Sequence, residues 1–129
     1  MTGEQSSGAA RTERVIVLVW DGMRPDYVTQ ELTPTLCALA ASGSRYRRAT
    51  GIFPSVTRPT TSSVSTGTYP ATHGVTGNLF VGPPGDRAAL DTGERAPLER
   101  LRAVHDGRIL PVPTLAEAVA AAGKRIVVL

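Results

Sequence analysis

The sequence predicts an α/β fold in three layers, with helices on both faces of a largely parallel sheet. A continuous apolar run over residues 15–20 lacks the alternation of a half-exposed strand, which indicates a strand buried on both faces. A helical pattern over residues 33–42 follows it, and a second helix-then-strand pair covers residues 114–122 and 126–129. Strands that alternate with helices in this way are typical of parallel α/β sheets.

The first segments give a tail and a candidate ligand residue. Residues 1–14 are polar and rich in glycine and serine, so we predict a flexible tail ahead of a domain over residues 15–129. Asp21 and Gly22 come directly after the first predicted strand. Open α/β sheets bind ligands at the carboxyl ends of their strands, which makes Asp21 a candidate. The alternative is a turn aspartate before a glycine.

A helix is expected to begin at Thr33 and Pro34, with threonine as its N-cap and proline at its first position, and to end at Gly43. Residues 45–50 are then predicted to form a short strand. A hydroxyl-rich helix follows over residues 57–66, and Pro59 requires that it start near Thr57, because proline fits only the first turn.

The start of this second helix is the candidate chemical site. A helix N-terminus carries unpaired N–H groups and a partial positive charge, so it can hold a phosphate and favour an ionised hydroxyl. Thr57 is therefore a candidate nucleophile. The alternative is that Thr57 only caps the helix.

The second half of the chain begins with a loop over residues 68–78, after a helix stop at Gly67, and we predict a structural role for His73 in that loop. Residues 81–112 are predicted to be an excursion from the sheet, with a short helix over residues 97–104. Thr114 and Glu117 form a capping box that starts the last helix. A buried strand over residues 126–129 would need further neighbours, so the sequence predicts a fold incomplete at its C-terminus.

Composition narrows the class of protein. The net charge is +3, but the arginines are spread out and aromatic residues are few, so no nucleic-acid-binding face is expected. Cys37 is the only cysteine, which excludes a disulfide framework within the chain. No apolar run approaches the roughly 18 residues that span a membrane, and the N-terminus lacks the apolar core of a signal peptide. We expect a cytoplasmic protein, with secretion left open.

Several motifs occur in an order and at a spacing that resemble the type I phosphodiesterase / nucleotide pyrophosphatase family of the alkaline phosphatase superfamily. The resemblance covers residues 15–80 and, more loosely, residues 113–129. Its motifs are Val15–Gly22, Thr33–Leu36, Phe53–Thr57, Thr66–Pro70, His73–Gly74 and Gly77–Asn78.

The resemblance implies an alkaline phosphatase-like core with two Zn²⁺ ions that hydrolyses small phosphodiester or nucleotide substrates. It implies that Asp21 binds one metal, that Thr57 is the nucleophile and also contacts a metal, and that Asn78 donates to a phosphoryl oxygen. Two tetrahedral zinc ions need about three protein ligands each. The chain has only two histidines, His73 and His105, so we expect this chain alone to be inactive.

Two alternatives stay open. Arg58, Thr60 and Thr61 depart from the family pattern, which leaves the substrate undetermined. A phosphonoacetate hydrolase-like enzyme or a phosphomonoesterase of the same superfamily would share residues 15–80. The missing metal ligands also allow a different class, an inactive truncated remnant or a binding module.

Overall fold

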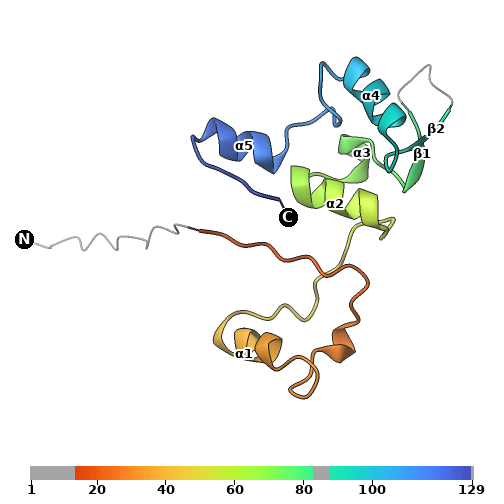
Figure 1. The fold of residues 1–129 in the computed structure, drawn as a ribbon. Helices are drawn as coiled ribbons and strands as arrows, with labels where there is room; N and C mark the ends of the chain where they lie inside the picture. The colour runs from red at the N-terminus through yellow and green to blue at the C-terminus, as the bar shows by residue number, and fades with distance from the viewer. Residues whose placement is uncertain (1–13, 83–87, 129) are drawn as a thin grey trace, which may run out of the picture. The chain divides into compact units, whose positions relative to one another are not determined.

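The computed structural model describes residues 14–82 and 88–128, so nearly all of the predicted tail lies outside the described residues. The chain divides into two compact units, residues 1–45 and residues 46–129. Figure 1 shows the elements of each unit. None of the helices among the described residues has both the length and the apolar character needed to cross a bilayer.

The first unit contains a 3₁₀ helix, η1 (Pro25–Tyr27), and the helix α1 (Pro34–Ser42). The prediction for α1 is confirmed, with Pro34 at the first helical position and Gly43 after the end. The Thr33 hydroxyl does not cap the helix. It donates to the Tyr27 and Thr29 carbonyl oxygens and accepts from the Thr29 N–H, so it closes the turn that leads into α1.

The apolar run over residues 15–20 is extended but has no ladder partner among the described residues. Its side chains are largely exposed, from 78% for Val15 to 53% for Trp20. Residues 126–128 are likewise unpaired, with Val128 86% exposed. A strand forms only where a neighbour supplies hydrogen-bond partners. The described residues therefore do not form the predicted parallel sheet.

The predicted strand over residues 45–50 is wrong. Residues 47 and 48 form a turn, and Tyr46 is 82% exposed. The one sheet among the described residues is an antiparallel pair, β1 (Leu79–Val81) and β2 (Ala89–Asp91). The strand β2 lies within the predicted excursion over residues 81–112, whereas β1 begins two residues before it. It pairs Leu79 with Asp91 and Phe80 with Leu90.

The second unit contains the helices α2 (Thr57–Thr66), α3 (Pro70–His73), α4 (Arg95–Val104) and α5 (Leu115–Ala121). The predicted start of α2 is confirmed, and it ends at Gly67, whose φ of 68° is one that glycine adopts readily. The loop prediction missed α3, a single turn. The helix predicted over residues 97–104 begins earlier, at Arg95. The capping box of α5 is confirmed.

The core of the second unit lies among α2, α3, α4 and the hairpin. Val75, Leu90 and Leu101 are its buried apolar side chains among the described residues, and Leu90 is fully buried. Figure 1 shows α3 beside α2, with α4 next to the hairpin. This packing holds the first turn of α2 near the start of β1, where the candidate site lies.

Candidate active site

The N-terminus of α2 lacks a capping side chain of its own. Val56 occupies the N-cap position, and its side chain has no oxygen to accept a hydrogen bond. Thr57 is the first helical residue and is exposed, and Pro59 is buried in the first turn, where its missing N–H costs nothing. The alternative in which Thr57 caps the helix is therefore wrong. Its side chain lies instead where the helix carries partial positive charge.

Asn78 supplies the missing cap from a distant part of the chain. The backbone N–H of Arg58, the second helical residue, donates to the Asn78 side-chain oxygen Oδ1 over 3.1 Å. An asparagine amide has one oxygen acceptor and one NH₂ donor group. Because the oxygen faces the helix, the NH₂ group is the part of Asn78 that can donate to a ligand. The structure thus brings Asn78 to the residue next to Thr57.

Arg58 is a site residue that the sequence did not identify. Its Nη1 donates to the Asn78 main-chain oxygen and to Asp91 Oδ1, each over 2.5 Å. The Gly93 N–H donates to the same Asp91 oxygen over 2.8 Å. The Gly93 hydrogen bond, followed by that of Arg58, lowers the pKa of the Asp91 carboxyl. The only signal in the sequence was the departure from the family pattern at position 58, because Asp91 is 33 residues away.

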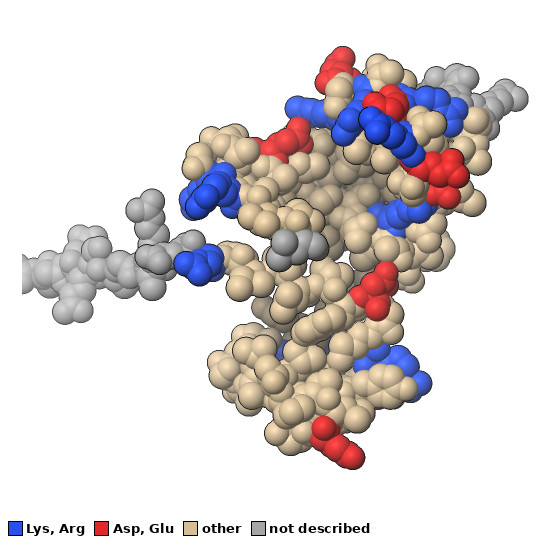
Figure 2. All heavy atoms as spheres, in the orientation of Figure 1, with Lys and Arg blue, Asp and Glu red and all other residues tan. Residues whose placement is uncertain are grey.

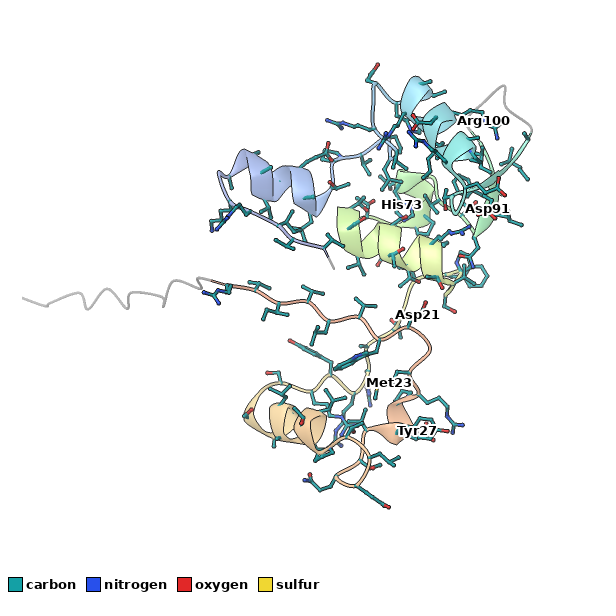
Figure 3. The ribbon with its side chains drawn as sticks, in the orientation of Figure 1. Asp21, Met23, Tyr27, His73, Asp91 and Arg100 are labelled. Carbon is teal, nitrogen blue, oxygen red and sulfur yellow. The ribbon has the colours of Figure 1, made fainter. Side chains whose placement is uncertain are left out.

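His73 has the structural role that the sequence predicted. It is only 1% exposed, and Figure 3 shows it at the end of α3, beside α2. Its Nδ1 accepts a hydrogen bond from the Val75 N–H over 3.2 Å, so in the neutral ring the proton is on Nε2. The Nε2–H then donates to Ser63 Oγ over 2.9 Å. Burial lowers the pKa of His73, because a charged imidazole would lose its hydration.

Asp21 lies in the first unit, in a turn from Trp20 to Met23 closed by a 3.4 Å hydrogen bond. Gly22 supplies the positive φ of 73° that the turn requires. The carboxylate of Asp21 is on an exposed residue. Its partnership with Thr57 at a metal stays a prediction, because the two residues belong to different units.

The described residues do not fit a two-zinc centre. They contain no group of three or more His, Cys, Asp or Glu side chains that could hold a metal ion. Both ring nitrogens of His73 are engaged, and Asp91 is paired with Arg58. His105 also bonds through Nδ1 to the Ile109 carbonyl. The described residues therefore supply too few metal-binding side chains to hold two zinc ions by themselves.

A hollow of about 470 Å³ opens beside the first turns of α2, where Arg58, Thr61 and Ser62 contribute to its wall. Apolar side chains line much of the rest: Val75, Leu101, Ile109, Leu110 and Val112. Its three arginines are each paired with a carboxylate, in the pairs Arg58–Asp91, Arg102–Glu99 and Arg108–Glu117. Figure 2 shows basic and acidic side chains interspersed over the surface near α4. The hollow has the size of a small-molecule site, without an unbalanced positive charge.

The comparisons with known proteins agree with the resemblance seen in the sequence. The sequence model of the type I phosphodiesterase / nucleotide pyrophosphatase family matches residues 15–128, so the chain belongs to this family.

An uncharacterized pyrophosphatase/phosphodiesterase of Schizosaccharomyces pombe is 39% identical over 69 residues, which cover 54% of this chain and 14% of the relative. An ectonucleotide pyrophosphatase/phosphodiesterase of Caenorhabditis elegans is 32% identical over 72 residues, 56% of this chain and 10% of the relative. The chain thus spans a small part of the length of these curated relatives. No solved structure matches it.

Proposed function

We propose that the complete protein hydrolyses the phosphodiester or pyrophosphate bond of small, nucleotide-like substrates. Thr57 is the nucleophile, and the NH₂ group of Asn78 donates to a phosphoryl oxygen. The observation that carries the proposal is the hydrogen bond from the Arg58 N–H to Asn78 Oδ1. It holds an oriented amide beside the exposed hydroxyl residue that begins α2.

The chemistry follows from these positions. The Thr57 hydroxyl gives up its proton to water, and its oxygen forms a bond to phosphorus as the bond to the leaving oxygen breaks and that oxygen takes up a proton. The intermediate is a threonine phosphate ester that keeps the remaining substituent of the substrate. Water then cleaves its bond between phosphorus and the threonine oxygen, and Thr57 regains its proton. Negative charge grows on the phosphoryl oxygens during both steps. The partial positive charge of the α2 N-terminus and the Asn78 NH₂ group stabilise that negative charge. Both are already positioned before the reaction, so no rearrangement of the protein is needed.

The metal site and the sheet belong to the same proposal. Asp21 is a ligand of one of two Zn²⁺ ions, and most of the other ligands lie outside these 129 residues. The exposed apolar segments at residues 15–20 and 126–128 are strands of a parallel, alkaline phosphatase-like sheet whose partners also lie outside. Their high exposure supports this, because such apolar runs are stable as strands only when both faces are covered. The cytoplasmic location remains a prediction.

The first test replaces Thr57 in the complete protein. Thr57→Ala is expected to abolish turnover of bis-p-nitrophenyl phosphate while metal content stays near two ions per chain. The matched control is Thr66→Ala, which removes a hydroxyl that bonds to the Ser62 carbonyl at the far end of the same helix. Turnover by Thr57→Ala at the rate of the control would remove Thr57 from the mechanism.

A second test separates the two functions of Asn78. Asn78→Asp keeps an oxygen for the Arg58 N–H but loses the NH₂ donor, whereas Asn78→Ala loses both. We expect Asn78→Asp to retain the thermal stability of the wild type and to lower kcat by about 10²–10³-fold, the usual effect of removing one such donor. Unchanged turnover in Asn78→Asp would contradict the donor role.

The substrate class is decided by a panel. A phosphodiesterase cleaves bis-p-nitrophenyl phosphate in preference to p-nitrophenyl phosphate and phosphonoacetate. A preference for either of the other two substrates would instead assign the protein to the phosphomonoesterase or phosphonoacetate hydrolase-like alternative.

A further inference from the structure

The contacts of Arg58 point to a function for a residue outside the proposed catalytic pair. We propose that Arg58, held by Asp91, is a positioning residue that fixes Asn78 for its donation to the substrate. The inference rests on the proposed function, since it assigns Arg58 to the same site. It also makes the β1–β2 hairpin the part of the fold that sets the geometry of that site.

Arg58 holds Asn78 at two points. Its backbone N–H fixes the Asn78 side chain through Oδ1, and its Nη1 fixes the Asn78 main chain through the carbonyl oxygen. An amide held at its oxygen and at its own backbone has little freedom to turn its NH₂ group away. Reacting groups that are misplaced by about 1 Å can lose roughly 10²-fold in rate.

Arg58 is in turn held by the far strand of the hairpin. Asp91 accepts from Nη1 of Arg58, and the Gly93 N–H fixes the accepting oxygen. A β-carbon added to Gly93 would lie 2.5 Å from Nη2 of Arg58, so the backbone packs directly against the guanidinium. Nη1 of the guanidinium is thus engaged by two protein oxygens, which favours an effect through Asn78 over direct contact with substrate.

The hairpin register explains why these residues meet. Leu79, the residue after Asn78, pairs directly with Asp91. Asn78 and Asp91 therefore lie at the same end of the two-stranded ladder, and Figure 3 shows Asp91 there, near the start of α2. Arg58 links that end of the ladder to the first turn of the helix. The hairpin and the helix N-terminus are joined at the one place where Asn78 must be oriented.

The structural test uses the complete protein and needs no activity. Three variants disturb the Arg58–Asp91 pair in different ways: Arg58→Met removes the guanidinium, Asp91→Asn removes the charge, and Gly93→Ala adds bulk without changing charge. The matched control is Arg95→Met, which breaks an exposed ion pair with Glu99 on α4. Each variant is first checked for folding by the amide shifts of Val75 and Leu101, in the core.

We expect the side-chain NH₂ resonances of Asn78 to shift and broaden, and the Arg58 amide to exchange faster with solvent, in all three variants but not in the control. Asn78 resonances that stay unchanged in folded Arg58→Met and Gly93→Ala would overturn the inference. If Arg58→Met unfolds, Arg58→Lys takes its place. This variant keeps one cationic donor, so its Asn78 resonances are expected to lie closer to those of the wild type than in the other variants.

The kinetic test uses the complete protein and a double-mutant cycle with Asn78→Ala. Arg58→Met is expected to lower kcat about 10²-fold, with a much smaller change in KM. In the Asn78→Ala background the same substitution should cost nothing further, because Arg58 acts through Asn78. Additive losses would show that Arg58 acts on the substrate independently. Should Asn78→Ala leave kcat unchanged, the proposed function fails, and the Asn78 resonances still decide whether Arg58 positions that residue.

Discussion

At the scale of single residues, the backbone near the candidate site explains why position 77 is a glycine. Gly77 precedes Asn78, and a β-carbon on Gly77 would lie 2.7 Å from the Leu79 carbonyl oxygen. That contact is with backbone, which cannot swing aside as the end of a long side chain can. In the Gly77–Asn78 motif, the glycine therefore allows the backbone to pass close to Leu79. That close approach helps to orient the side-chain amide of Asn78.

Gly77→Ala is accordingly expected to move Leu79 and, with it, Asn78. The Arg58 amide, which donates to Asn78, should exchange faster with solvent, and the thermal midpoint should fall. Hydrogen exchange followed by NMR measures the first effect. Gly51→Ala is the matched control, because a β-carbon there meets nothing within 4 Å. Equal protection of the Arg58 amide in both variants would contradict this explanation of Gly77.

His73 makes the stability of the second unit depend on pH. Burial lowers its pKa in the folded state below the ordinary value of 6.5, so below that pH the unfolded chain binds more protons than the folded chain. The stabilisation is thus complete above about pH 6.5 and is lost as the pH falls toward the lowered pKa. Urea midpoints at pH 5 and pH 7.5 measure the loss.

The contribution of His73 is isolated by comparing variants. His73→Asn should be less stable at pH 7.5 and should show a smaller drop between the two pH values. His105→Asn is the control, since His105 is only half-buried and bonds to the Ile109 carbonyl. It should keep the wild-type drop, and a similar drop in all three proteins would show that other groups cause the pH dependence.

At the scale of elements, α2 is a helix that its own sequence supports weakly. Serine and threonine have modest helix propensity, and here their hydroxyls bond back to carbonyls of the preceding turn, as Thr61 does to Thr57 and Thr66 does to Ser62. The helix depends on packing against α3 and on the cap from Asn78. The N-terminal end of α2 is thus held by tertiary contacts.

The hairpin depends on one core side chain. Leu90 is 0% exposed and pairs with Phe80 across the ladder. Leu90→Ala should lower the free energy of unfolding by about 2–5 kcal/mol, the range for a buried leucine. Leu79→Ala on the partner strand is the control, because Leu79 is 63% exposed. A urea titration that shows equal losses for the two variants would refute the assignment of Leu90 to the core.

At the scale of the whole molecule, the described residues include the proposed nucleophile Thr57 and the proposed donor Asn78, but too few metal ligands for two zinc ions. We therefore expect the 129-residue chain not to bind two zinc ions tightly. Isothermal titration with zinc measures this, and Cys37→Ser separates out weak binding by the lone thiol. Stoichiometric binding of two zinc ions, together with hydrolysis of bis-p-nitrophenyl phosphate, would contradict both this expectation and the ligand count behind it.

The apolar segments at residues 15–20 and 126–128 are not buried by the rest of the described residues. In the first unit, none of the described residues is buried, and the run over residues 15–20 stays exposed. The same holds for residues 126–128. Unpaired apolar strands are prone to pair with other chains. The sequence pattern predicted buried strands in both runs, but a sheet needs several strands together, and the described residues supply no partner strand for either run.

The sequence by itself determined the features that depend on neighbouring residues. The starts of α1 and α5, the position of Pro59 in the first turn of α2 and the glycine stop after it all follow from capping chemistry and from allowed backbone angles. The family motifs added the expectation for Thr57 and Asn78. Only the tertiary structure decided how Asn78 caps α2, how Arg58 is held by Asp91, and that an antiparallel hairpin spans the start of the predicted excursion. These contacts join residues 20 and 33 positions apart, and no local preference encodes such a pairing.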